Sequence, residues 1–363
     1  MRIGLLIYGS LDLLTGGFLY DRYLVRHLQA RGHTVEIIAL PWRTYGRCLL
    51  HNVSPGLLTR VRTAACDLLL QDELTHPSLF LLNQRLKRRI DIPLVTIVHQ
   101  VLCRQPRPDW QNAFYRAIET RYLDSVDAYI VNSQSTRATL EHLLDMKQRP
   151  WIVASPGGDR LGTLSSIHSI STRAVQPGPL RLLFIGNLLP HKGLHTLLEV
   201  LSQAPQEIWR LTVVGDLTMN QPYARSIRAR IQQAGLSAQV HLTGPLDGEV
   251  LAEHLRHSHL FVMPFSQEGF GIVYLEAMAY GLPAIGSSSG AAKDLIQSGH
   301  NGFLIDPQHP SALLVHLQRL HHDRECLNQM GYAALKTFQA QPTWAESMEA
   351  VHQFIRRLAI PPN

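Results

Sequence analysis

Short runs of apolar and β-branched residues recur along this chain, and the stretches between them are long enough for helices. In the first half the runs are RIGLLIYG, TVEIIAL, DLLLQ, PLVTIVHQ, AYIVNS and WIVAS. Between the first two, YDRYLVRHLQARGH places apolar residues at a helical period and ends near Gly32, a residue typical of helix C-termini. Repeated strand, helix and strand units predict a parallel sheet covered by helices on both faces.

The same alternation of apolar runs and helix-length stretches begins again after a stretch rich in Ser, Thr, Gly and Pro. The second set of runs is LRLLFIGN, RLTVVGD, QVHLTG, LFVMPF, PAIGS and GFLID. A length of 363 residues suits two domains. We therefore predict an α/β fold with two Rossmann-like, doubly wound domains facing a cleft, at residues 1–164 and 180–344, joined by a linker at 165–179. A C-terminal helix at about 345–363 is expected to pack back on the first domain.

Composition narrows the classes of function. Hydrophobic residues make up 45% of the chain and charged residues 17%, enough apolar material for two buried sheets. The net charge of +6 favours anionic ligands or surfaces, but basic and aromatic residues are not interleaved as in a nucleic-acid groove. We therefore expect a phosphate-bearing small molecule or an anionic lipid surface, and no nucleic acid.

The cysteines and histidines argue against disulfides and metal. Four cysteines without a CxxC pair suggest reduced thiols and a cytoplasmic protein. The histidines of HLRHSH, at 254, 257 and 259, lack a carboxylate or thiol that would complete a metal site, so we predict no metal. No run approaches the length of a membrane span. The basic run RLKRRI at 85–90 could lie on an anionic membrane, although a solvated helix end is the simpler interpretation.

The segment FSQEGFGIVYLEAMAYG, residues 265–281, is the most informative for chemistry. It predicts a loop followed by a helix that begins near Gly271, and amides at such an N-terminus can bind a phosphate. Glu276 falls inside this apolar helix, where an unpaired carboxylate would cost several kcal/mol, so it needs donors such as sugar hydroxyls. The alternative is that Glu268 complements the helix dipole while Glu276 faces solvent or an internal arginine.

Glu268 and Glu276, with GFGIVYL between them, resemble the E-x7-E motif of the retaining glycosyltransferases of family 4, which have the two-domain GT-B fold. The following AMAYGLPAIGSSSGAAKDLIQSGHNGFLIDP is similar to the same family over some forty residues. The resemblance implies that Glu276 binds the ribose hydroxyls of a nucleotide sugar and that Glu268 approaches the donor sugar. It also implies that the amides of Phe270, Gly271 and Ile272 meet the sugar and the diphosphate.

Further segments of the second half resemble the family less strongly. FIGNLLPHKG is similar to a segment in which a lysine, here Lys192, neutralises the donor diphosphate. Asn187 stands where the family usually has an arginine, which leaves the contact of this position with the diphosphate open. VVGD and VHLTGPL imply that Gly215, Thr243 and Gly244 line the nucleotide site, although a glycine at a strand end is often only a turn.

In the first half, LTGGFLYD and PLVTIVHQ carry the resemblance. Gly16 and Gly17 correspond to a glycine pair that passes close to the donor phosphates and the acceptor, although a tight turn explains them equally well. His99 ends a predicted strand, where the family's histidine faces the donor sugar; a histidine that only caps a loop is the alternative. HQVLCRQPRPDW and LTGGF are expected to bind the acceptor.

The resemblance implies a metal-independent, retaining hexosyltransferase. It would move a hexose-type sugar from a nucleoside diphosphate of the UDP or GDP type to a hydroxyl of a glycan, a lipid or a small molecule, with no other cofactor. The catalytic set would be His99, Glu268 and Lys192. Two alternatives stay open: a catalytically weak sugar-nucleotide-binding or regulatory protein, and a GT-B-fold epimerase. A cytoplasmic enzyme in peripheral contact with the inner membrane face fits a lipid acceptor.

Overall fold

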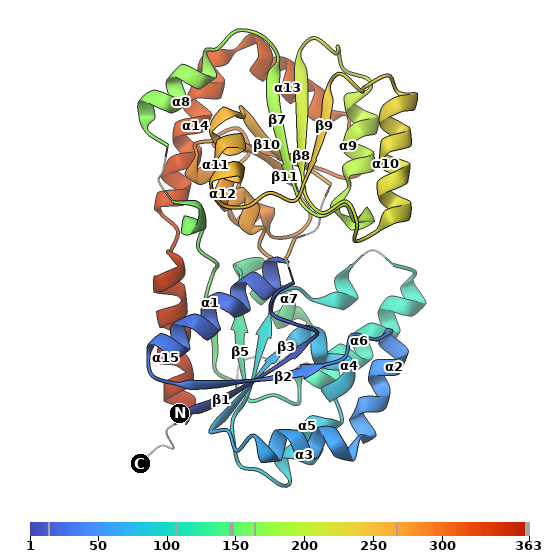
Figure 1. The fold of residues 1–363 in the computed structure, drawn as a ribbon, viewed down its shortest axis with the longest axis vertical. Helices are drawn as coiled ribbons and strands as arrows, with labels where there is room; N and C mark the ends of the chain where they lie inside the picture. Colours follow the sequence, from blue (N-terminus) through green and yellow to red (C-terminus); the bar gives the residue numbers. More distant parts are fainter. Residues whose placement is uncertain (14, 106, 145–148, 163–164, 266–267, 360–363) are drawn as a thin grey trace. The chain divides into compact units, whose positions relative to one another are not determined.

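The computed structural model describes residues 1–13, 15–105, 107–144, 149–162, 165–265 and 268–359 (Figure 1). The chain divides into two compact units, of which the first comprises Met1–Pro156 and Pro342–Asn363 and the second Gly157–Gln341. Each unit contains a parallel sheet of six strands with helices packed around it. The prediction of two doubly wound α/β domains is therefore confirmed.

The sheet of the first unit has the strand order β2-β1-β3-β4-β5-β6. Every strand run expected in the first half forms a strand: β1 (Arg2–Tyr8), β2 (Thr34–Leu40), β3 (Leu68–Asp72), β4 (Leu94–Val98), β5 (Ala128–Val131) and β6 (Trp151–Val153). The helices of this unit are α1 (Gly16–Ala30), α2 (Tyr45–Leu49), α3 (Pro55–Thr63), α4 (His76–Leu79), α5 (Leu82–Lys87), α6 (Asp109–Leu123), α7 (Gln134–Leu143) and α15 (Trp344–Ala359).

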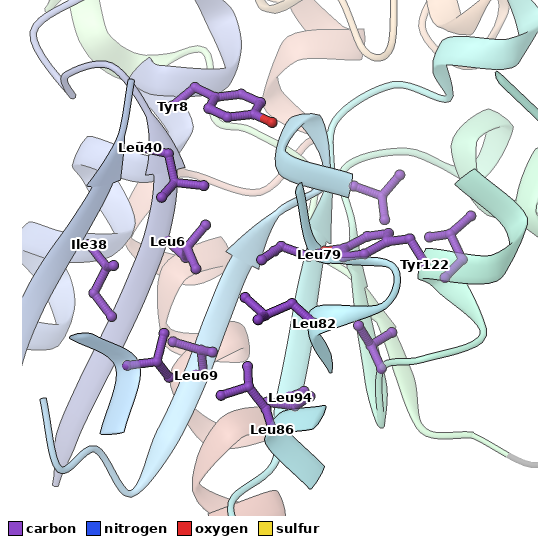
Figure 2. Close-up of a cluster of buried hydrophobic side chains, with 14 of the residues drawn as sticks. Leu6, Tyr8, Ile38, Leu40, Leu69, Leu79, Leu82, Leu86, Leu94 and Tyr122 are labelled. Atoms are coloured by element: carbon purple, nitrogen blue, oxygen red, sulfur yellow. The ribbon is translucent and has the colours of Figure 1, made fainter. Parts of the chain in front are cut away.

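Figure 2 shows the core on one face of this sheet. Leucine, isoleucine and tyrosine side chains of β1 to β4 pack against α4, α5 and α6, and the labelled members are Leu6, Tyr8, Ile38, Leu40, Leu69, Leu79, Leu82, Leu86, Leu94 and Tyr122. These side chains are at most 5% exposed. Because successive residues of a strand point to opposite faces, strands with apolar residues on both faces, such as β3 and β4, must be covered on both sides.

The second unit has the strand order β12-β11-β10-β7-β8-β9. Each predicted run again forms a strand, although β8 begins one residue before its run: β7 (Leu180–Ile185), β8 (Trp209–Val214), β9 (Val240–Gly244), β10 (Leu260–Met263), β11 (Ala284–Ser287) and β12 (Gly302–Ile305). Its helices are α8 (Ile167–Ala174), α9 (Leu194–Leu201), α10 (Gln221–Gln233), α11 (Gly248–His257), α12 (Ile272–Ala279), α13 (Ala312–His322) and α14 (Arg324–Gln339).

The stretch 165–179, which the sequence indicated as a linker, instead contains helix α8 and belongs to the second unit. Ile170 on α8 is 1% exposed and lies against Gly281 and Gly331. Arg173, 6% exposed, donates hydrogen bonds to the carbonyl oxygens of Tyr280 and Gly281. The local composition resembles a linker because only a few side chains of this short helix make its buried contacts.

Helix α15 packs along α1 within the first unit (Figure 1). Trp344 at its start stacks on Tyr23, with ring centroids 4.1 Å apart. Further along, Glu349 pairs with Arg31 at 2.7 Å and with His27 at 3.0 Å. Polar and aromatic contacts therefore hold the last helix of the chain on the first.

Two further features bear on the sequence predictions. The four cysteines are free thiols, and three of them are buried. Among the helices of the described ranges, none is both long enough and apolar enough to cross a bilayer.

Candidate active site

The order of strands in the second unit reverses between β7 and β10. The chain runs outward from β7 through β8 to β9, and from β10 through β11 to β12 in the other direction. Loops that leave two such adjacent strands diverge, and ligands of doubly wound folds bind in the resulting crevice at the carboxyl ends of the strands. Lys192 follows β7 and Glu268 follows β10, so both lie at this switch point.

A close backbone approach brings these two loops together. Gly193 has φ 71°, and a side chain there would place its Cβ 2.6 Å from Cβ of Phe265 in the opposite loop. Only glycine fits a position that needs both positive φ and direct contact with a neighbouring backbone. As a result, Lys192 Nζ lies 2.6 Å from Glu268 Oε1, and the two side chains are only 21% and 17% exposed.

Helix α12 begins next to this pair. Gly271 caps the helix, Ile272 is its first residue, and Phe270 before them is buried. Tyr274 on the first turn is fully buried, and its hydroxyl donates to the carbonyl oxygen of Met263 on β10 at 2.8 Å. That bond anchors the helix start to the sheet, with the positive end of the helix dipole close to Lys192 and Glu268.

Glu276 is 1% exposed and is paired with an arginine that the sequence analysis did not identify. Arg160 Nε donates to Glu276 Oε1 at 2.8 Å, and the same guanidinium also pairs with Asp247. Burial raises the pKa of the Glu276 carboxyl, although the charge of Arg160 opposes that shift. The internal arginine that we considered as an alternative is therefore present, and GGDR, which precedes the first helix of the second unit, was its only sequence signal.

Three strand ends meet beside the pair of loops. The amide of Gly215 after β8 donates to the carbonyl oxygen of Gly244 at 3.0 Å. Asn187 Oδ1 accepts a hydrogen bond from the amide of Asp216 at 3.1 Å, so this side chain joins the ends of β7 and β8. The hydroxyl of Thr243 donates to the carbonyl oxygens of Val213 and Gly244. Asn187 and Thr243 thus have clear structural roles in joining the strand ends, and their predicted roles at the nucleotide stay predictions.

The first unit has its own switch point, between β1 and β3. The loop after β1 leads to Gly16 and Gly17 at the start of α1, where Thr15 accepts a capping hydrogen bond. His99 follows β4, and a Cβ on Gly17 would lie 3.1 Å from His99 Cδ2. The glycine pair and the histidine, which are far apart in the sequence, are therefore neighbours within one unit.

The loop after His99 is held by a buried carboxylate. Glu119 on α6 is fully buried and accepts hydrogen bonds from the amides of Leu102 at 2.6 Å and Cys103 at 2.8 Å. Glu73 and His76, also buried, complete a polar cluster in which Glu73 Oε1 lies 3.0 Å from His76 Nδ1. Burial, followed by the charge of its neighbour Glu73, raises the pKa of Glu119 to about 8. Burial likewise raises the pKa of Glu73 to about 8.

This pair predicts that the first unit becomes less stable as the pH rises. A carboxyl with a raised pKa in the folded state contributes stability below its unfolded value near 4.5, and that contribution is lost as the pH rises through about 8. We expect the free energy of unfolding to fall by several kcal/mol between pH 5 and pH 9, up to about 4 kcal/mol for each of the two carboxyls. In Glu73→Gln, whose amide cannot ionise, about half of this fall should disappear in urea denaturation, while the exposed Glu141→Gln should behave as wild type. Equal pH dependence in both variants would contradict the assignment.

Clusters of acids and histidines are the candidates for metal ligands. In the described ranges three groups could share a cation: Asp21 with Asp72 and His99, Glu73 with His76 and Glu119, and His27 with Glu349 and His352. All three lie in the first unit. Of the HLRHSH histidines, His259 is buried, at 1% exposed; one ring nitrogen accepts from the amide of Arg181 and the other bonds the carbonyl oxygen of Arg173.

Family models match most of the chain. The model described as Glycosyltransferase Family 4 matches residues 16–160, and the model described as Glycosyl transferases group 1 matches residues 171–337. Among curated relatives, a D-inositol 3-phosphate glycosyltransferase of Paenarthrobacter aurescens is 29% identical over 58% of this chain and 53% of its own length. The sulfoquinovosyl transferase SQD2 of Arabidopsis thaliana is 33% identical over 41% of this chain and 28% of its own length. The chain thus spans about half or less of these two relatives.

Solved structures resemble the chain over nearly its whole length. The sucrose-phosphate synthase of Thermosynechococcus elongatus has a TM-score of 0.81 and 21% identity over 98% of both chains. Anabaena HepE in complex with UDP and glucose has a TM-score of 0.76 and 19% identity over 98% of this chain and 99% of its own. At these identities the likeness establishes the fold, and it agrees with the two units described above.

Proposed function

Because the chain belongs to glycosyltransferase family 4, we propose that it is a retaining hexosyltransferase. It moves a hexose-type sugar from a nucleoside diphosphate sugar, of the UDP or GDP type, to a hydroxyl of an acceptor. The observation that carries the proposal is the Lys192–Glu268 pair beside the start of α12, at the switch point of the second unit. A lysine and a helix N-terminus side by side provide the positive potential that a diphosphate needs.

In the proposed complex the donor diphosphate takes the place of Glu268 as the partner of Lys192. The ammonium then stabilises the negative charge that the diphosphate gains as the sugar bond breaks. Glu268, released from Lys192, accepts hydrogen bonds from hydroxyls of the donor sugar. The amides of Phe270, Gly271 and Ile272 bind the sugar and phosphate oxygens, and Gly215, Thr243 and Gly244 line the nucleotide.

Glu276 is proposed to bind the ribose. Arg160 engages Oε1 of this carboxylate, and the hydrogen bonds of the described residues leave Oε2 for a ribose hydroxyl. The charge of Arg160 offsets part of the cost of burying the carboxylate and so favours the ionised form that accepts hydrogen bonds. In this proposal the ion pair and the ribose contact coexist.

The proposed reaction needs no protein nucleophile. The acceptor hydroxyl attacks the anomeric carbon on the face from which the diphosphate departs, and a departing phosphate oxygen takes the hydroxyl proton. Orientation and electrostatic stabilisation of the oxocarbenium-like state are then the main tasks of the protein. His99 contacts the donor sugar, and no metal or other cofactor is required, since Lys192 and the helix amides carry the diphosphate charge.

The first unit is proposed to bind the acceptor around Gly16, Gly17 and the loop that follows His99. We propose a cytoplasmic location, with peripheral contact at the inner membrane face if the acceptor is a lipid. The support for such contact is the net charge of +6. Within the basic run 85–90, Arg85 bonds the carbonyl oxygen of Asn52 and Lys87 pairs with Asp127, so part of this charge is already engaged.

A thermal-shift screen with UDP-, GDP- and ADP-sugars identifies the donor, because a ligand that binds only the folded chain raises its unfolding temperature. For the donor found, Glu276→Gln should weaken binding about 10- to 100-fold, since a hydrogen bond to a charged group contributes about 1.5–3 kcal/mol. Acceptor-dependent release of nucleotide, with retained configuration in the product by NMR, then tests the reaction itself.

The exposed Glu325→Gln on α14 is the matched control and should leave the thermal shift unchanged. Nucleotide binding without any acceptor-dependent product would favour the regulatory alternative, and interconversion of the free donor would favour an epimerase. If Glu276→Gln bound the donor as tightly as wild type, the proposed ribose contact would be wrong.

A further inference from the structure

Two buried acids lie behind His99 in the first unit. Asp21 on α1 is 0% exposed and Asp72 at the end of β3 is 1% exposed. One carboxylate oxygen of each acid and a ring nitrogen of His99 lie within 4.8 Å of one another. Asp21 lies on the helix that follows β1, Asp72 ends β3 and His99 follows β4. All three therefore lie at or next to the switch point between β1 and β3, the edge of the sheet where ligands bind.

The first turns of α1 hold the histidine ring on several sides. Asp21 Oδ1 lies 3.3 Å from His99 Nε2. The ring of Tyr20 meets the imidazole edge-on with centroids 5.2 Å apart, and Gly17 approaches Cδ2, the carbon bonded to Nε2. The backbone carbonyl of His99 is fixed as well, since it accepts from Asn132 Nδ2 at 2.9 Å. Nε2 is therefore hydrogen-bonded to Asp21 within the first unit, which leaves Nδ1 as the ring nitrogen that can bind a ligand.

Charge balance requires protons in this cluster. Asp21 Oδ2 is buried and has no hydrogen-bond partner within the described ranges, where the ion pairs of Asp21 and Asp72 include no lysine or arginine. Two adjacent buried carboxylates cannot both stay charged without a cation. A proton on each of His99 and Asp72 leaves an ionised Asp21 beside an imidazolium, with no net charge.

The titration tendencies agree with this distribution. Burial, followed by the charge of Asp21, raises the pKa of Asp72 to about 7. Burial alone would lower the pKa of His99, but the hydrogen bond to Asp21 and the charges of both acids raise it overall. Other titratable groups also face the cluster: His76 on α4, Glu73 next to Asp72, the phenols of Tyr8 and Tyr122, and Tyr20, whose hydroxyl donates to the carbonyl oxygen of Ala154. Burial raises the pKa of Tyr20 far above neutrality, so it stays neutral.

We propose that Asp21 and Asp72 are positioning residues that hold His99 as an imidazolium, with Nε2–H bonded to Asp21 and Nδ1–H directed to the sugar donor. This inference rests on the proposed function. A fixed cation near the reacting sugar would stabilise the departing diphosphate or orient a sugar hydroxyl without moving during the reaction. Neutral His99 could present either a lone pair or a proton at Nδ1, so the acids decide which of the two the donor meets.

The full chain labelled with ¹⁵N-histidine tests the proposal independently of activity. His99→Gln identifies the His99 signals among those of the 19 histidines. In wild type the ring should stay doubly protonated above pH 7. In Asp21→Asn the pKa of His99 should fall by at least about one unit, because an adjacent opposite charge raises the pKa of a cation by about 1–3 units. Asp72→Asn should lower it less, and the exposed Asp91→Asn should not change it.

The pH profile of sugar transfer provides the second readout. In Asp21→Asn the alkaline limb of kcat/KM should move to lower pH by the same amount as the pKa of His99. At pH 8 this should appear as a loss of about 10-fold or more. A neutral His99 at pH 7 in wild type, or an unchanged pKa of His99 in Asp21→Asn, would overturn the proposal, and the wild-type titration decides the matter even if the variant does not fold.

Two further outcomes distinguish this proposal from a bound metal ion and from a failure of the proposed sugar transfer. Activity that is lost in EDTA and restored by Mn²⁺, with a shift of the His99 signals on adding Mn²⁺, would mean that the three side chains bind a cation, and would overturn the proton assignment. If no sugar is transferred from any donor while the pKa of His99 still depends on Asp21, the proposed function fails but the positioning of His99 by Asp21 holds.

Discussion

Lys192→Ala is expected to lower kcat/KM for sugar transfer by about 10²- to 10³-fold, comparable to removing one preorganised donor from the site of a developing anion. The ammonium of Lys192 is only partly exposed and lies at the point where the loops after β7 and β10 touch. Its charge is therefore poorly screened by water, and no flexible surface lysine can replace it. Steady-state kinetics with the donor from the thermal-shift screen measure the loss.

The matched control is Lys336→Ala, on the exposed side of α14 in the same unit. It should change kcat/KM by less than about twofold, as expected for a surface substitution away from the site. In Lys192→Ala the nucleoside diphosphate should also give a smaller thermal shift than in wild type. Activity equal to wild type in Lys192→Ala would contradict the role of this lysine in binding the diphosphate.

Gly215→Ala is expected to destabilise the second unit by about 4 kcal/mol or more, because it forces two backbones apart. A Cβ at this position would lie 2.0 Å from the carbonyl oxygen of Gly186 on the neighbouring strand end, far inside van der Waals contact. The atom in the way belongs to the backbone, and Gly186 is itself held by a hydrogen bond from its amide to the carbonyl oxygen of Val214. Neither backbone segment can move without breaking the hydrogen bonds that join the ends of β7, β8 and β9.

Thermal unfolding and the yield of soluble protein measure this effect, and Gly235→Ala serves as the control. Gly235 has φ 66°, and a methyl group added there would meet no atom within 4 Å, so its substitution carries only the cost of a left-handed backbone, about 1–2 kcal/mol. A difference of several degrees between the unfolding midpoints of the two variants separates the clash from the backbone strain. Similar midpoints would show that the strand ends can relax.

The elements of the fold were predictable because their signals are local. Every expected strand run contains a strand, since a buried parallel strand needs a continuous apolar run between turns. The helix start at Gly271 was visible for the same reason. The linker at 165–179 was not, because the side chains that make α8 part of the second unit, Ile170 and Arg173, find their partners on distant segments.

The candidate active site was likewise predictable only where its signals are local in the sequence. Glu276 could be singled out because a carboxylate in an apolar helix must have a partner, but the partner, Arg160, lies 116 residues away in the sequence. Asp21 and Asp72 were missed even though both gave a signal. Asp21 shares the buried face of α1 with Leu24 and Leu28, and Asp72 belongs to a pair of acids at the end of a strand.

The amino-acid sequence by itself determined the α/β class, the positions of the strands and the family. Each of these depends on short-range patterns and on motifs formed by contiguous residues. Tertiary structure alone decided which charges meet: Lys192 with Glu268, Arg160 with Glu276, and His99 with Asp21. The physical reason is that ion pairs in the interior form between groups that topology makes adjacent at the ends of parallel strands, and the strand order that sets this adjacency is a property of the folded sheet.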